Sequence, residues 1–123
     1  MEDENKEITK TDISMTGFAI VAYSGDARTA LIKAMKEARE GHITKARDLV
    51  KEANDSINAA HNEQTKLLSK EASGMDMDVT FIMVHGQDTL MTTMLLKDQM
   101  ETIINLYERI NKLEGKTVDW RDC

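Results

Sequence analysis

A histidine and an aspartate stand three residues apart in a stretch of sequence that is otherwise free of formal charge. Residues 79–96, VTFIMVHGQDTLMTTMLL, contain eighteen residues, and Asp88 carries their one formal charge. The low polarity around His85 favours the neutral imidazole, which is the nucleophilic form of the side chain. A histidine in apolar surroundings is more often a structural residue, so both interpretations of His85 stay open at this point.

The apolar residues around Asp88 repeat at the spacing of a coiled-coil seam. Read as a helix, the run places one set of residues on a single face at alternating intervals of three and four: Phe81, Val84, Asp88, Met91 and Leu95. The opposite face is also largely apolar, with Val79, Ile82, Met83, Gly86, Leu90, Thr93 and Met94. A helix that is apolar on both faces has none left for water. We therefore expect one face to pack on the chain's own core and the other on another subunit.

The carboxylate of Asp88 has a chemical consequence if that second face is an interface. A charge within an apolar seam is costly unless something compensates it. Copies of the helix that meet around a symmetry axis would bring their Asp88 carboxylates together, and these would need a bound cation or a shared proton. The alternative is an Asp88 that is merely solvated at the edge of the helix, which its four apolar neighbours in the seam disfavour.

Three long helices are expected to position these residues. Apolar residues recur at the helical period in the first segment, which should be capped by Thr11 or Asp12 and ended by Gly41. The second helix begins near His42, and so short a link makes the first two helices antiparallel. The third runs from about residue 79 to 113, with Asp78 expected as its N-cap.

This organisation predicts an all-α, antiparallel up-down-up three-helix bundle. Its domain covers residues 12–114, between a polar, disordered arm at 1–11 and a short tail at 115–123. Counting along the helices places His85 level with Gln64 on the second helix and with Phe18 on the first. Gly25, inside the first helix, costs about 0.5–1 kcal/mol relative to alanine, so we expect a close backbone contact there.

Composition excludes several classes of function. The net charge of −6 argues against a nucleic-acid-binding protein. No start of the signal-peptide type is present, and the run 79–96 contains His, Gln and Asp, which makes it a poor membrane span. The sequence has no glycine-rich phosphate loop and no zinc-type spacing of ligands. We expect a cytoplasmic protein that neither binds nucleic acid nor inserts into a membrane.

Three segments resemble the enzyme IIA component, of the lactose/cellobiose (diacetylchitobiose) type, of the bacterial sugar phosphotransferase system. The run VTFIMVHGQDTLMTTMLL resembles the family signature VHAQDhLM and the TxxLL-like stretch that follows it. GDARTAL at 25–31 resembles AG(D/E)AR, and AHNEQTKLLSKEA at 60–72 resembles AHxxQTxLIxxEA. Their order and spacing also agree, so the resemblance covers roughly residues 13–113.

The resemblance implies a phosphotransferase component that forms a homotrimer of three-helix bundles. His85 would be the phosphorylated histidine, which accepts a phosphoryl group from HPr and passes it to a cysteine of the cognate IIB. Asp88 would lie on the trimer axis and bind a divalent cation, Mg²⁺, between three carboxylates. Gln87 matches a family glutamine beside the active site, and Gln64 matches a family position on the second helix that could support it.

Two positions depart from the family pattern, and one alternative function stays open. Where the family often has a second histidine, four residues after the first, this chain has Thr89, which cannot serve as an imidazole. Tyr23 replaces another family histidine. Cellobiose, diacetylchitobiose and lactose all remain candidate sugars, because the membrane partner selects the sugar. The alternative is a non-catalytic helical trimer that acts as an interaction module, in which His85 could be replaced without functional loss.

Overall fold

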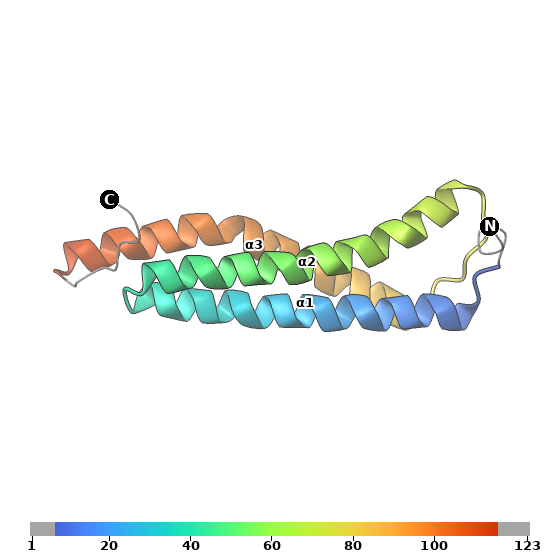
Figure 1. Ribbon diagram of the computed structural model, residues 1–123, viewed down its shortest axis with the longest axis horizontal. Coiled ribbons are helices and arrows are strands. Elements are labelled where there is room, and N and C mark those ends of the chain that lie inside the picture. Colours follow the sequence, from blue (N-terminus) through green and yellow to red (C-terminus); the bar gives the residue numbers. More distant parts are fainter. Residues whose placement is uncertain (1–6, 116–123) are drawn as a thin grey trace.

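The three segments of helical periodicity form three long α-helices. The computed structural model describes residues 7–115, and within this range the chain has no strand. Helix α1 spans Lys10–Arg39, α2 spans Ile43–Ala72 and α3 spans Phe81–Leu113. They lie lengthwise in one rod, with consecutive helices joined at opposite ends and α3 behind the other two (Figure 1). The expected all-helical, three-helix fold is confirmed, while residues 1–6 and 116–123 of the expected arm and tail lie outside the described range.

Helix α1 begins with a reciprocal cap between Thr9 and Asp12. Its N-cap, Thr9, lies two to three residues before the N-cap predicted from the sequence. Thr9 Oγ1 accepts a hydrogen bond from the backbone N–H of Asp12 at 3.1 Å, and Asp12 Oδ2 accepts one from the backbone N–H of Thr9 at 3.0 Å. This capping box satisfies two N–H groups that the helix itself leaves free. The prediction that Thr11 or Asp12 is the N-cap was therefore wrong, and Asp12 instead completes the cap from inside the first turn.

The start of α3 is corrected in the same way. Thr80 is the N-cap, and its hydroxyl accepts a hydrogen bond from the backbone N–H of Met83 at 3.2 Å. The predicted cap, Asp78, and the expected first residue, Val79, both precede the helix. Thr80 is buried, and its hydroxyl satisfies one of the first N–H groups of the helix, which have no acceptor within the helix itself.

The end of the rod at which α1 joins α2 contains a glycine turn and a buried asparagine. Gly41 has a φ of 89° directly after the C-cap of α1, which is the left-handed geometry that glycine adopts most easily, and the prediction that Gly41 ends the helix is confirmed. Asn111 of α3 is buried, and its Nδ2 donates to Ala38 O at 3.0 Å and to Tyr107 O at 2.7 Å. The amide thus joins α3 to the last turn of α1.

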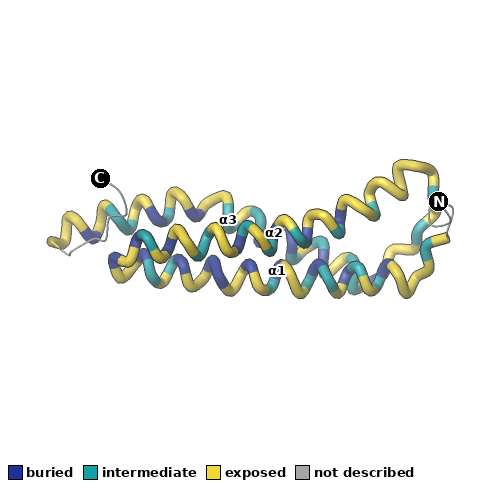
Figure 2. Tube along the Cα trace, in the orientation of Figure 1, coloured by how far each residue is buried: buried dark blue, intermediate teal, exposed yellow. Residues whose placement is uncertain are grey.

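The core combines small residues with a few large ones. Six alanines of α1 and α2 are completely buried: Ala27, Ala34, Ala38, Ala46, Ala53 and Ala60. The largest buried apolar side chains come from all three helices: Ile20, Leu31, Ile43, Leu90, Met100 and Ile104. Buried residues lie along the inward sides of the helices, whereas the last turns of α2 are exposed and leave the bundle (Figure 2).

Helices α1 and α3 come into backbone contact at two glycines. A Cβ atom on Gly17 would lie 2.9 Å from Met83 N, and one on Gly86 would lie 2.8 Å from Gly17 O, closer than real Cβ atoms approach. Gly25 has no atom within 4 Å of the corresponding position, so the close contact predicted there is wrong. The contact between Gly17 and Gly86 sets the register of the two helices and agrees with the expected level of His85 beside Phe18.

Candidate functional site

The outward face of α3 carries the predicted apolar seam. Phe81 is 89% exposed, and Val84, Met91 and Leu95 are between 43% and 59% exposed. On the inward face, Gly86, Leu90 and Thr93 are buried, as predicted. Val79 is the exception in the inward set, because it precedes the helix and is exposed. A single chain therefore covers one face of α3 and leaves the other open.

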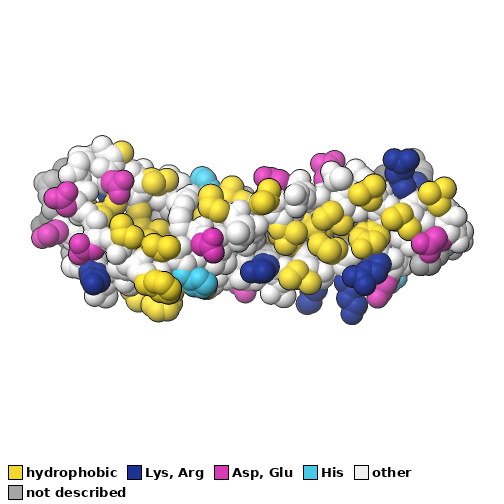
Figure 3. Space-filling model, turned by 180° about the vertical axis from the view of Figure 1, so that it is seen from behind, with side chains coloured by type: hydrophobic (Ala, Val, Ile, Leu, Met, Phe, Trp, Pro, Cys, Tyr) yellow, Lys and Arg dark blue, Asp and Glu magenta, His cyan; other side chains and the backbone are white. Residues whose placement is uncertain are grey.

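The apolar face continues beyond the predicted seam. Leu106, Ile110 and Leu113 are also exposed, and at the helical period they fall within the same arc of about 100° as the four seam residues. Seen from the α3 side, hydrophobic side chains follow one another along most of the molecule (Figure 3). The stripe therefore has two parts on α3, Phe81 to Leu95 and Leu106 to Leu113, which the exposed polar residues Gln99 and Thr102 separate, and Asp88 lies inside the first part.

His85 and Asp88 are both exposed, and a threonine one turn later bonds to the backbone of each. Thr89 Oγ1 donates to His85 O at 2.8 Å, and Thr92 Oγ1 donates to Asp88 O at 2.9 Å. The imidazole is therefore accessible to a partner protein, and the carboxylate stands on an apolar face without burial in the single chain.

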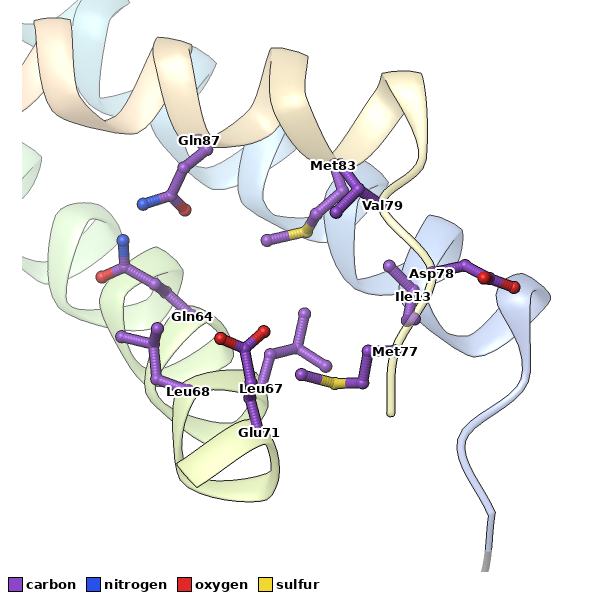
Figure 4. Close-up of a pocket in the computed structure, with 10 residues that line it drawn as sticks. All are labelled: Ile13, Gln64, Leu67, Leu68, Glu71, Met77, Asp78, Val79, Met83 and Gln87. Atoms are coloured by element: carbon purple, nitrogen blue, oxygen red, sulfur yellow. The ribbon is translucent and has the colours of Figure 1, made fainter. Parts of the chain in front are cut away.

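Gln64 and Gln87 meet in a different place. They line a largely apolar cavity of about 230 Å³ between the end of α2 and the start of α3, together with Ile13, Leu67, Leu68, Glu71, Met77, Asp78, Val79 and Met83. Their amide groups point toward one another across it, while the carboxylate of Asp78 points away (Figure 4). Gln64 is 7% exposed, and the buried Oε1 of Gln87 has no hydrogen-bond partner among the described residues.

One chain does not bring these two amides to His85. Two residues along an α-helix correspond to a rotation of about 200°, so His85 and Gln87 project from nearly opposite sides of α3. His85 is not among the residues that line the cavity. Within one chain, the four predicted site residues thus form two groups: His85 and Asp88 toward the open face, and Gln64 and Gln87 in the cavity.

The other two histidines lie outside both groups. His61, on the exposed side of α2, has its Nδ1 3.5 Å from Thr65 Oγ1. His42, at the start of α2, has its Nδ1 2.6 Å from Glu37 Oε2, and this hydrogen bond is the main cause that lowers the pKa of Glu37 below its ordinary value.

The sequence analysis missed a cluster of possible ligand atoms at this end of the rod. The ligand atoms of Glu37, Glu40 and His42 lie within 4.8 Å of one another. Lys45 Nζ is 3.5 Å from Glu37 Oε1 and already supplies positive charge there. The sequence did contain a signal for this cluster: Glu37 and Glu40 lie three residues apart, and a glycine turn and His42 follow them.

No helix in residues 7–115 is long and apolar enough to cross a membrane.

Comparison with known proteins finds the same family from sequence and from structure. The model of the family described as "PTS system, Lactose/Cellobiose specific IIA subunit" matches residues 15–108. The lactose-specific EIIA component of Lacticaseibacillus casei is 60% identical over 108 residues, which are 88% of this chain and 96% of that protein. The corresponding component of Staphylococcus epidermidis is 47% identical over 102 residues, covering 83% of this chain and 98% of that protein.

Two solved structures have the same fold. The crystal structure of PtcA from S. mutans superposes with a TM-score of 0.80 at 37% identity, covering 82% of this chain and 99% of that one. The cellobiose-specific enzyme IIA of Bacillus anthracis superposes with a TM-score of 0.77 at 31% identity, covering 89% of this chain and 96% of that one. Residues 15–108, which the family model matches, include both groups of predicted site residues, His85 with Asp88 and Gln64 with Gln87.

Proposed function

Since the chain belongs to the lactose/cellobiose-specific IIA family, a phosphocarrier component of the sugar phosphotransferase system, we propose that His85 is its phosphoryl-carrying residue. HPr is the proposed donor, and a cysteine of the cognate IIB is the proposed acceptor. The observation that supports this most directly is the exposed imidazole of His85 on α3, inside the family match and beside the apolar stripe. The proposal includes a cytoplasmic location, in which HPr and IIB would meet this chain.

Phosphoryl transfer requires an in-line approach and stabilisation of charge more than covalent help from the protein. A neutral imidazole nitrogen of His85 attacks phosphorus, and a new N–P bond forms as the N–P bond of the donor's phosphohistidine breaks. In the second transfer, a thiolate attacks phosphorus and the N–P bond to His85 breaks. Phe18 of α1, which is exposed, level with His85 and outside the stripe of α3, could form part of a surface on which both partners dock and exclude water.

We further propose that the up-down-up bundle assembles as a homotrimer around the apolar stripe of α3. The seven large apolar side chains of the stripe are each more than 40% exposed, and exposed apolar side chains gathered on one face mark an interaction surface. Asp88 would then stand at the axis. Three carboxylates offer the hard oxygen ligands that Mg²⁺ prefers, so the residue present fits a divalent cation there.

A threefold arrangement would also join the two groups of site residues. Around α3, His85 lies about 60° from Asp88 on one side and Gln87 about 100° on the other. In a closed ring of parallel helices, one flank of each helix faces the opposite flank of the next. The His85 of one subunit would therefore face the cavity containing Gln64 and Gln87 of its neighbour, whose amides could donate hydrogen bonds to the phosphoryl oxygens.

The carrier role is tested by reconstituting the relay from phosphoenolpyruvate to IIB. We expect His85→Ala to stop transfer to the IIB cysteine, whereas His61→Ala, a matched replacement of an exposed helical histidine, should leave it unchanged. A His85→Ala protein that still delivers phosphoryl groups would refute the assignment and favour the interaction module.

The shared site is tested by mixing subunits. Gln87→Ala homotrimers should transfer more slowly, and mixed trimers of His85→Ala and Gln87→Ala chains should regain competent sites in which His85 of one chain meets Gln87 of the other. If mixing restores nothing, the two residues do not act across an interface.

The axial site is tested with Asp88→Leu. This variant should remain trimeric in sedimentation experiments and lose its dependence on divalent cations, because leucine continues the apolar seam. A monomeric variant would contradict this view of the stripe.

A further inference from the structure

The Thr89 hydroxyl is held in a defined orientation beside His85. Its Oγ1 donates to His85 O at 2.8 Å. In an α-helix that carbonyl also accepts the backbone N–H of residue 89, so the hydroxyl is not needed to satisfy it. A hydroxyl has one proton and two lone pairs. With its proton directed to the backbone, Thr89 Oγ1 can only accept a hydrogen bond from a neighbouring side chain.

A second histidine–threonine pair shows what a hydroxyl at this spacing can reach. His61 and Thr65 of α2 are also four residues apart, and Thr65 Oγ1 lies 3.5 Å from Nδ1 of His61. His85 and Thr89 have the same four-residue spacing on α3, although Thr89 Oγ1 is directed to His85 O and meets the ring only when the ring turns toward it. His85 is exposed, so its ring is free to turn about its side-chain bonds toward Thr89.

We infer that Thr89 is a positioning residue that accepts a hydrogen bond from Nδ1–H of His85 and so leaves Nε2 as the nucleophile. The inference rests on the proposed role of His85. Because Thr89 Oγ1 already donates to the backbone, it cannot donate to the ring, and the contact is made only by the tautomer with its proton on Nδ1.

The same contact serves both transfer steps. Nε2 forms the N–P bond while the donor's bond to phosphorus breaks, and no proton needs to move. The proton that stays on Nδ1 then lets the ring leave as neutral imidazole when a thiolate attacks phosphorus. Thr89 thereby replaces, with a hydroxyl, a position at which the family often carries a second histidine.

The test compares the tautomer of His85 in four proteins. Long-range ¹H–¹⁵N correlation spectra at alkaline pH, with ¹⁵N-labelled histidine, report which ring nitrogen holds the proton. We expect Nδ1–H in the wild type and in Thr89→Ser, and a shift toward Nε2–H in Thr89→Val, which lacks the hydroxyl at similar volume. Thr92→Val is the control for loss of a neighbouring threonine hydroxyl, because Thr92 Oγ1 donates to Asp88 O and to Thr89 O at 3.1 Å but lies two turns from His85.

Phosphorylation rates give a second readout. Thr89→Val should be phosphorylated about fivefold more slowly, as for the loss of one ordinary hydrogen bond, with Thr89→Ser restoring the rate and Thr92→Val unaffected. Identical tautomers in all four proteins would overturn the role of Thr89, even if His85 is phosphorylated. A wild type that accepts no phosphoryl group would overturn the proposed function, while the spectra would still decide whether Thr89 holds the ring.

Discussion

Alanine should change the free energy of unfolding in opposite directions at Gly86 and at Gly25, because only Gly86 contacts the backbone of another helix. An alanine at Gly86 would place its Cβ 2.8 Å from Gly17 O, a backbone atom that can move only if α1 and α3 separate. Overpacking of this kind costs about 1–3 kcal/mol. Alanine also improves helix propensity by about 1 kcal/mol over glycine, so Gly86→Ala should lower the free energy of unfolding by up to about 2 kcal/mol.

Gly25→Ala is the matched control. Gly25 lies in the interior of α1, and no atom is within 4 Å of its Cβ position, so alanine brings the propensity gain without a clash. The free energy of unfolding should therefore rise by about 0.5–1 kcal/mol. Because the propensity change is similar at both positions, the difference between the two variants measures the clash, which should amount to about 1–3 kcal/mol.

Urea unfolding followed by far-ultraviolet circular dichroism measures both variants. The protomer concentration must be equal throughout, because the stability of an oligomer depends on concentration. The double variant Gly17→Ala/Gly86→Ala should cost less than the sum of its parts, since the helices need to separate only once. If Gly86→Ala is as stable as Gly25→Ala, the close approach of α1 and α3 is refuted.

Three further predictions concern caps and charges at the ends of the helices. Thr9→Ala should cost about 1 kcal/mol of unfolding free energy and Thr11→Ala much less, because only Thr9 caps α1; equal losses in urea unfolding would contradict the capping box. Asn111→Ala should cost about 1–3 kcal/mol, since it removes two hydrogen bonds of about 0.5–1.5 kcal/mol each, and an unchanged unfolding midpoint would refute that role. The hydrogen bond from His42 lowers the pKa of Glu37 below its ordinary value, so the ionised carboxylate stabilises the fold; the advantage of the wild type over Glu37→Gln should shrink as acid protonates Glu37, and a constant difference across an acid titration would contradict it.

Periodicity predicted the helices and the open face of α3 because both depend on local spacing. The seam of Phe81, Val84, Met91 and Leu95 is exposed, which agrees with the prediction that the chain's own core covers only one face of this helix. The caps were less predictable, since several residues at each helix start can accept a backbone N–H. At α1, the reciprocal pair of Thr9 and Asp12 satisfies two groups at once, which a single cap at Thr11 could not do.

Contacts between helices were harder to predict, because they depend on register in three dimensions. Gly25 and Gly86 both interrupt helical patterns, yet only Gly86 meets the backbone of another helix. The separation of Gln87 from His85 was available from the helical period, because neighbours two positions apart in a motif project from nearly opposite sides of a helix. The cavity that Gln87 shares with Gln64 required the actual path of α2.

The proposed carrier role is tested most directly by intact mass at alkaline pH after incubation with phosphoenolpyruvate, enzyme I and HPr. A wild-type chain that gains one acid-labile phosphoryl group, together with a His85→Ala chain that gains none, is the predicted result. A wild type that stays unmodified, or a His85→Ala chain that is modified equally, would contradict the assignment of His85 as the phosphoryl carrier.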